Sequence, residues 1–108
     1  QVDNMVVRNV EIVRDTSFPQ KGCLIETPKP TANIKNLFLN NIVVNRMNTL
    51  ISHKNGKIGA IQVNNIMSSE MGDAIINTDK NIKQVNASAV YGAVLISSNS
   101  LGKIEKIS

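Results

Sequence analysis

Few acidic residues in this chain could act together in a reaction. Glu70 and Asp73 are the closest useful pair, and only Met71 and Gly72 separate them. Hydrolysis of a sugar bond by acid–base catalysis needs two carboxyl groups on one face, about 5–9.5 Å apart. The candidates for catalysis are therefore Glu70, Asp73 and Asp79.

His53 is the only histidine, and its side chain could act as a general base near neutral pH. It lies in the polar segment SHKNGK at 52–57, whose composition is typical of a turn. We therefore expect a solvated turn histidine rather than a catalytic base.

Cys23 is the only cysteine, so the chain can form neither an internal disulfide nor a cysteine-type zinc site. We expect it to be a small buried hydrophobic residue rather than a nucleophile. A single histidine also argues against zinc, and the calcium-binding nonapeptide repeat GGxGxDxUx is absent. We predict no metal and no cofactor.

The composition of the 108 residues fits one domain, or a piece of one, that is rich in strands and tight turns. The chain has 14 Ile, 11 Val and 6 Leu, and β-branched residues favour strands. It also has 15 Asn, a residue that tolerates a positive φ in tight turns. No apolar run approaches the ~20 residues of a membrane span.

The formal net charge of +4 would permit an anionic partner. The basic residues are scattered, however, and Phe18, Phe38 and Tyr91 are too few to stack nucleic-acid bases, so we do not expect nucleic acid as a partner. Lysines near the expected turns could keep the chain soluble or give one face an affinity for anionic glycans. These are Lys54, Lys57, Lys80, Lys83, Lys103 and Lys106.

An internal repeat supplies the elements that would position these residues. Five segments align, VDNMVVRNV, IKNLFLNNI, IGAIQVNNI, IKQVNASAV and IEKIS. Their first residues, Val2, Ile34, Ile58, Ile82 and Ile104, are 32, 24, 24 and 22 residues apart. Aliphatic residues recur at the first, fourth, sixth and ninth positions, which we expect to face one continuous core.

Each repeat contains a second apolar stretch, followed by turn residues such as Lys54-Asn55-Gly56. Three short strands per repeat, with no helical period between them, indicate a solenoid rather than a sheet with crossover helices. We predict an all-β parallel β-helix of about four coils of ~24 residues, a single domain over 1–108, with a fifth coil starting at Ile104. Both ends look cut from a longer polypeptide.

The asparagine at the eighth position of the repeat predicts a ladder. Equal positions of a solenoid stack about 4.8 Å apart, and an Asn at a tight corner takes the left-handed conformation at little cost. Its amide can then hydrogen-bond the Asn above and below. We expect Asn9, Asn41 and Asn65 to form this ladder inside the corner, with Asn41 buried and more important than Asn40.

Five residues after these asparagines lie Arg14, Arg46 and Glu70, which would form a column on the outside. One interpretation is a polysaccharide-binding strip in which Arg46 pairs with a sugar carboxylate. The simpler one, which we favour, is a surface salt bridge between neighbouring coils, contributing about 0–1 kcal/mol.

The segments VVRNV, LFLNNI and VNNI, each followed by a second aliphatic strand, resemble coils of the pectin-lyase-like superfamily. This group of right-handed parallel β-helix proteins includes pectate lyases, polygalacturonase-type glycoside hydrolases and phage tailspikes. The resemblance is architectural and covers nearly the whole chain. It implies a right-handed parallel β-helix and, often, binding or cleavage of an acidic or complex polysaccharide.

The catalytic motifs of the polygalacturonase branch do not carry over. Asn77-Thr78-Asp79 spells that branch's NTD, but the next coil has no paired aspartates. The segment around His53 precedes the NTD, whereas the family's histidine segment follows it. We interpret the NTD as a chance match.

We therefore expect a structural, receptor-binding or polysaccharide-binding segment of a tailspike- or adhesin-like protein, not catalytic by itself. One alternative is a part of a polysaccharide-degrading glycoside hydrolase or lyase, although four coils span only ~20 Å. The other is a trimerisation or folding domain of a fibre. The resemblance implies an extracellular, cell-surface or virion location.

We also expect a homo-oligomer, such as a trimer, or continuation into a longer chain. Alternation places Leu24, Leu50 and Ile75 outward on successive coils, as an aliphatic stripe. Stripes of that kind mark interfaces.

Overall fold

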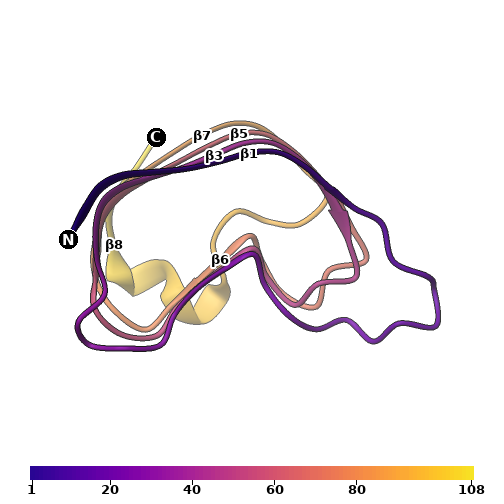
Figure 1. The fold of residues 1–108 in the computed structure, drawn as a ribbon, viewed down its shortest axis with the longest axis horizontal. Coiled ribbons are helices and arrows are strands. Elements are labelled where there is room, and N and C mark those ends of the chain that lie inside the picture. Colours follow the sequence, from indigo (N-terminus) through magenta and orange to yellow (C-terminus); the bar gives the residue numbers. More distant parts are fainter.

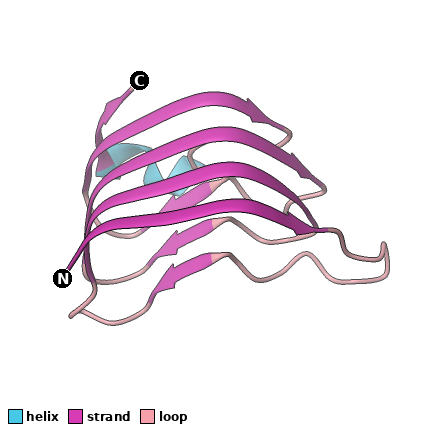
Figure 2. Ribbon diagram, turned by 45° about the horizontal axis from the view of Figure 1, so that its top comes forward, coloured by secondary structure: helices cyan, strands magenta, loops and turns pink.

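The computed structural model describes residues 1–108, which form a β-solenoid of about three turns (Figures 1 and 2). A five-stranded parallel sheet has the order β1 (Val2–Ile12), β3 (Asn33–Asn45), β5 (Lys57–Ser69), β7 (Ile82–Tyr91) and β8 (Ile104–Ile107). A three-stranded parallel sheet has the order β2 (Ile25–Thr27), β4 (Ile51–His53) and β6 (Ile76–Thr78). One short 3₁₀ helix, η1 (Ser98–Lys103), precedes β8. None of the helical structure has the length and apolarity needed to span a membrane.

The strand register confirms the alignment of the repeats. Val2 pairs with Ile34, and Ile34 pairs with Ile58. Further along, Ile61 pairs with Val85, and Ile82 pairs with Ile104. Equal positions of the repeat therefore lie side by side across the sheet, as a solenoid requires.

The core is the space between the two sheets, filled by aliphatic side chains from successive turns. Leu37, Ile61 and Val85, which share the fourth position of the repeat, are fully buried. Each such side chain contributes about 1.5–3 kcal/mol through its removal from water. Val2 departs from the expectation, since 41% of it is exposed. It lies on the outermost strand, where no further turn covers it.

The long strands differ from the three short strands expected in each repeat. β3 and β5 each run for 13 residues and bend at an asparagine instead of ending there (Figure 1). Asn41 has φ 59°, and Asn40 and Ile42 on either side of it remain paired with β5. One residue in the left-handed conformation therefore turns the strand, and the backbone pairing with β5 continues on both sides of it.

The expected outward stripe of Leu24, Leu50 and Ile75 is wrong. Leu50 and Ile75 are fully buried, and Leu24 is half-buried against the core. The backbone N–H groups of Leu50 and Ile51 both donate to the carbonyl oxygen of Ile75, each at 3.0 Å. Two residues thus face one on the next turn, as in a β-bulge, and simple alternation fails at this point. Leu50 and Ile51 are both buried as a result.

An apolar row does lie on the surface, at different positions. Val43 pairs with Met67, and Met67 pairs with Tyr91, on successive strands of the larger sheet. These residues are 38%, 54% and 59% exposed, respectively. They follow the bend of each strand, where alternation points them outward.

Candidate functional site

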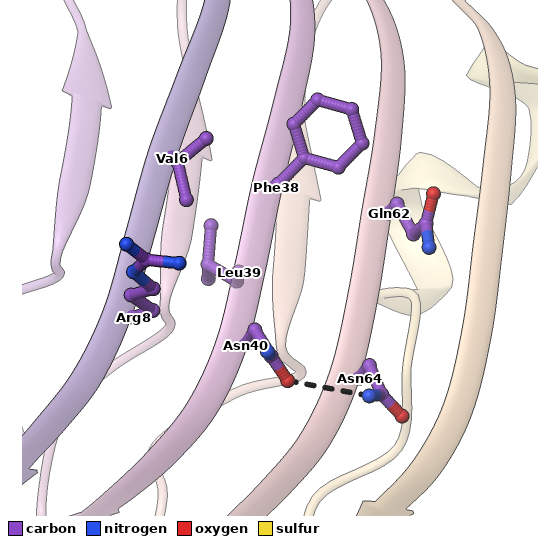
Figure 3. A pocket seen from close by; sticks show the side chains of 7 residues that line it. All are labelled: Val6, Arg8, Phe38, Leu39, Asn40, Gln62 and Asn64. Carbon is purple, nitrogen blue, oxygen red and sulfur yellow. Dashed lines mark hydrogen bonds between the residues drawn. The ribbon is translucent and has the colours of Figure 1, made fainter.

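A shallow depression of about 350 Å³ lies on the outer face of the five-stranded sheet (Figure 3). Three strands, β1, β3 and β5, supply its walls and floor, and most of its side chains are polar. We call this surface the amide face. Its residues are Val6, Arg8, Phe38, Leu39, Asn40, Gln62 and Asn64.

Strand alternation places these side chains together. Within β3, Leu37 and Leu39 point into the core, so Phe38 and Asn40 point outward. The register then puts Phe38 beside Gln62 and Asn40 beside Asn64. Neighbouring strands lie about 4.8 Å apart, so each row of outward side chains is continuous.

Hydrogen bonds hold part of the amide face in a fixed arrangement. The side-chain amide of Asn64 donates to Oδ1 of Asn40 at 3.2 Å, and the Ser88 hydroxyl donates to Oδ1 of Asn64 at 2.7 Å. The amide nitrogen of Asn40, the amide of Gln62 and the guanidinium of Arg8 have no hydrogen-bond partner in the protein. These groups remain available to a ligand.

The polar surface continues beyond the first depression. Asn36 and Gln84 border Phe38 and Gln62 on one side, and Asn86 borders Gln62 on the other. An amide offers both donors and an acceptor, which suits the hydroxyl groups of a sugar. Phe38 adds an apolar ring to which the less polar side of a sugar could attach. The arrangement can bind a chain of hydroxylated units, and no Asp or Glu side chain lines it.

The asparagine ladder lies at the bend of the same strands. The side-chain amide of Asn41 donates to Oδ1 of Asn9 at 2.8 Å, and that of Asn65 donates to Oδ1 of Asn41 at 3.2 Å. Asn9, Asn41, Asn65 and Ala89 all have φ between 52° and 59°. The expected burial of Asn41 is wrong, because this residue is exposed. Leu39 and Ile42 fill the interior on either side of the bend.

The column of Arg14, Arg46 and Glu70 holds the long loop that follows β1. Arg46 pairs with Glu70 in the only ion pair of the chain. Arg46 Nε also donates to the Phe18 carbonyl at 2.6 Å, and Arg14 Nη1 donates to the Arg46 carbonyl at 2.8 Å. The Arg14 guanidinium lies 4.3 Å from the centroid of the Phe18 ring. Most of the column's polar groups therefore bind this loop, which extends beyond the other turns (Figure 1).

Glu70 and Asp73 lie in one depression of about 570 Å³, but both carboxylates are engaged. Glu70 pairs with Arg46. Asp73 Oδ2 accepts hydrogen bonds from the Asn77 amide at 2.7 Å and the Ser97 hydroxyl at 3.1 Å. Its Oδ1 accepts from the backbone N–H of the next residue at 2.7 Å. This pattern is that of a structural carboxylate which fixes a turn.

His53 is buried, so the expected solvated turn histidine is wrong. It is the last residue of β4 and pairs with Thr27 and Thr78 on the adjacent turns. His53 Nδ1 lies 3.0 Å from Thr78 Oγ1, and Nε2 lies 3.2 Å from the Gly56 carbonyl oxygen. Burial is the main cause that lowers the pKa of His53. The ring is therefore a neutral core residue, which no substrate can reach.

The remaining candidates lie apart from the amide face. Asp79 is exposed and donates its backbone N–H to the His53 carbonyl at 2.9 Å. Cys23 is half-buried, and burial is the main cause that raises the pKa of its thiol. No group of three His, Cys, Asp or Glu side chains lies close enough together to hold a metal ion.

The amide face is not among the sites that the sequence predicts above. A signal was present, because the outward positions between the core columns carry Asn36, Asn40, Gln62, Asn64 and Asn86. These residues lie outside the aliphatic columns and the eighth position of the repeat, on which the predicted sites are based.

Comparisons of the chain with protein-family models, with curated proteins and with solved structures give no match. The resemblance to the pectin-lyase-like superfamily thus stays a prediction from the sequence.

Proposed function

We propose that the chain is a glycan-binding segment of a β-solenoid protein, of the tailspike or adhesin kind, that does not cleave its ligand. The observation that carries the proposal is the amide face, where Asn40, Gln62 and Arg8 have polar groups without protein partners beside the ring of Phe38. Sugar-binding surfaces need such groups, because each hydroxyl that loses water must regain a hydrogen bond. An extracellular, cell-surface or virion location follows as part of this proposal.

The state of the carboxylates supports binding over cleavage. A glycosidase needs one carboxyl group that donates a proton and a second that attacks or activates water. Glu70 is held by Arg46, and Asp73 accepts three hydrogen bonds from the protein. The amide face itself carries no acid. A role as part of a polysaccharide-degrading enzyme would require catalytic groups from outside these residues.

A glycan array, followed by titration of the best ligand, tests the proposal. Phe38→Ala and the double substitution Asn40→Ala/Asn64→Ala should each weaken binding about tenfold, equivalent to about 1.4 kcal/mol. Phe18→Ala is the matched control, since it removes an exposed ring from a loop outside the amide face, and it should leave binding unchanged. A reducing-sugar assay on the same ligands should detect no release. Equal losses in variant and control, or release of reducing ends, would contradict the proposal.

A second candidate function is the assembly of several copies of the chain. The exposed apolar row of Val43, Met67 and Tyr91 favours it. We propose that a second copy of this chain covers this row, in place of the expected stripe at Leu50. Met67→Lys should then lower the mass measured by sedimentation, while the circular dichroism spectrum stays unchanged. A wild-type chain that sediments as a monomer would rule out this candidate.

A further inference from the structure

A second depression, of about 510 Å³, lies at the corner where the strands of the larger sheet begin. Four lysines border it, and Glu105 is the only acidic residue among its lining side chains. We call it the lysine pocket. Its basic residues are Lys35, Lys57, Lys80 and Lys83.

The strand register brings two of these lysines to opposite sides of a glycine. Ile34 pairs with Ile58 and Asn36 pairs with Ala60, so Lys35 lies beside Gly59. Ala60 also pairs with Gln84, so Lys83 lies on the other side of Gly59. The strands are about 4.8 Å apart, which separates the two lysine Cα atoms by about 10 Å.

Gly59 leaves the space between the two lysines free of a side chain. Close packing of the strands excludes any larger residue, because a Cβ at this position would lie 2.6 Å from the Lys35 carbonyl oxygen. The floor between the lysines is therefore backbone, and long flexible side chains can converge over it from both sides.

The charge of the pocket is not neutralised within the protein. Arg46 and Glu70 form the only ion pair of the chain, so none of the four lysines is paired with an acid. Four lysines and one glutamate give a local net charge of +3 within a chain whose formal net charge is +4. Such a concentration of one sign in a concave site attracts anions.

We propose that the lysine pocket binds a tetrahedral oxyanion, a sulfate or phosphate group. The four lysines border the pocket from three strands and from the turn that carries Lys80. A tetrahedral group presents oxygens in several directions and can accept from several of these donors at once, whereas a carboxylate presents two oxygens in one plane. No aromatic side chain lines the pocket, so it lacks the stacking platform by which proteins hold single-stranded nucleic acid.

The position of the pocket suggests that the anion is an ester group on a glycan. Lys35, Gly59 and Lys83 immediately precede Asn36, Ala60 and Gln84, which border Phe38 on the outer face. A sugar chain on the amide face could therefore place a substituent in the pocket. This extension rests on the proposed function, whereas binding of the free anion does not.

Titration with inorganic anions, followed by ¹H–¹⁵N NMR, tests the pocket on its own. Sodium sulfate and sodium phosphate are added in separate experiments at constant ionic strength, with acetate as the planar probe. The amide signals of Gly56 and Gly59, which line the pocket, should shift saturably with sulfate or phosphate and much less with acetate. Those of Gly22 and Gly102, which lie outside the pocket, should not move.

Two double variants with the same charge change separate the pocket from general attraction. Lys35→Gln/Lys83→Gln should weaken anion binding at least about tenfold. Lys21→Gln/Lys29→Gln removes two exposed lysines outside the pocket. This double variant should weaken anion binding less than about twofold. The single substitutions Lys35→Gln and Lys83→Gln, each with a partial loss, serve if the double variant does not fold.

Several outcomes would overturn the site. These are an absence of shifts at Gly56 and Gly59, equal shifts with acetate, and equal losses of anion binding in the two double variants.

A glycan array then tests the extension with neutral, sulfated, phosphorylated and carboxylated forms and a DNA oligonucleotide. Preference for the sulfated or phosphorylated glycan, lost in Lys35→Gln/Lys83→Gln, supports the extension. Preference for the DNA or the carboxylated form contradicts it. Binding of a neutral glycan without the anion shifts would retain the proposed function and refute the pocket.

Discussion

The side-chain amide of Asn41 donates to Oδ1 of Asn9 on the neighbouring turn, 2.8 Å away, and both residues have a positive φ. Oδ1 of Asn41 also accepts a hydrogen bond from the side-chain amide of Asn65 at 3.2 Å. One residue type thus supplies both the bend of the strand and the link between turns.

Replacement of Asn41 by alanine should destabilise the fold more than replacement of Asn40. Asn41→Ala removes two ladder hydrogen bonds and places alanine in a left-handed conformation, at a combined cost of about 2 kcal/mol. Asn40→Ala removes one exposed hydrogen bond and should cost about 0.5 kcal/mol. Thermal melts of the two variants measure the difference. Asn41→Gly separates the causes, since it relieves the backbone but not the ladder. Equal melting temperatures for Asn41→Ala and Asn40→Ala would contradict a role for the ladder.

The buried histidine should make stability depend on pH. Burial lowers the pKa of His53 in the folded chain below its ordinary value of 6.5, so the unfolded chain binds the proton more tightly. Stability is therefore full above about pH 6.5, falls as the pH drops toward the folded pKa, and levels off below it. Asp79 opposes the shift, and Lys80 adds to it.

Urea unfolding between pH 8 and pH 5 measures this dependence. His53→Gln should be less stable at pH 8, because its side chain fits the two ring contacts poorly, but its stability should change less across this range. An unchanged pH dependence in the variant would assign the effect to other groups.

Gly92 should tolerate no side chain. Its φ is +101°, and a Cβ would lie 1.8 Å from the Ser68 carbonyl oxygen. Gly92→Ala should therefore lower the free energy of unfolding by about 3 kcal/mol. Gly102→Ala is the control, since a Cβ at that glycine meets no atom within 4 Å. Chemical denaturation of both variants should show a loss for Gly92 alone, and a neutral Gly92→Ala would contradict this close approach.

The bulge at the start of β4 makes a prediction about burial. Leu50→Ala leaves a cavity in the core and should cost about 2–5 kcal/mol. Met67→Ala, at an exposed position, should cost less than about 0.5 kcal/mol. Guanidinium unfolding of the two variants tests whether Leu50 faces the core. A small loss in the free energy of unfolding for Leu50→Ala would contradict burial of Leu50 and favour its outward position.

The sequence predicts the large sheet well, because its aliphatic columns repeat at fixed positions. Ile34, Leu37, Leu39 and Ile42 show the inward phase, and the later turns repeat it. The smaller sheet is harder to predict, because the backbone N–H groups of Leu50 and Ile51 share the Ile75 carbonyl oxygen as acceptor. The alternation of inward and outward side chains is therefore displaced by one residue at this bulge. His53 misleads for another reason, since a polar residue between turn formers suggests solvent, yet its register with Thr27 and Thr78 places it inside.

The candidate sites were harder to predict than the fold. The amide face follows from the outward phase of the same strands, so it could be read from the sequence once the core columns are known. The lysine pocket depends on the corner at Lys35 and Gly59, where two successive residues of β3, Lys35 and Asn36, lie between the inward-facing Ile34 and Leu37. Simple alternation does not reveal such a corner.

Six of the eight extra residues of the first repeat lie in the loop between β1 and β2, and the stacked strands keep their register despite them. A gene encoding such a chain can therefore gain or lose residues at this loop, or duplicate a whole turn, without disturbing the turns on either side. Each duplicated turn would lengthen the outer surface by one strand, about 4.8 Å. Evolution could thus match the length of the binding surface to the length of its ligand by copying a segment of about 24 codons.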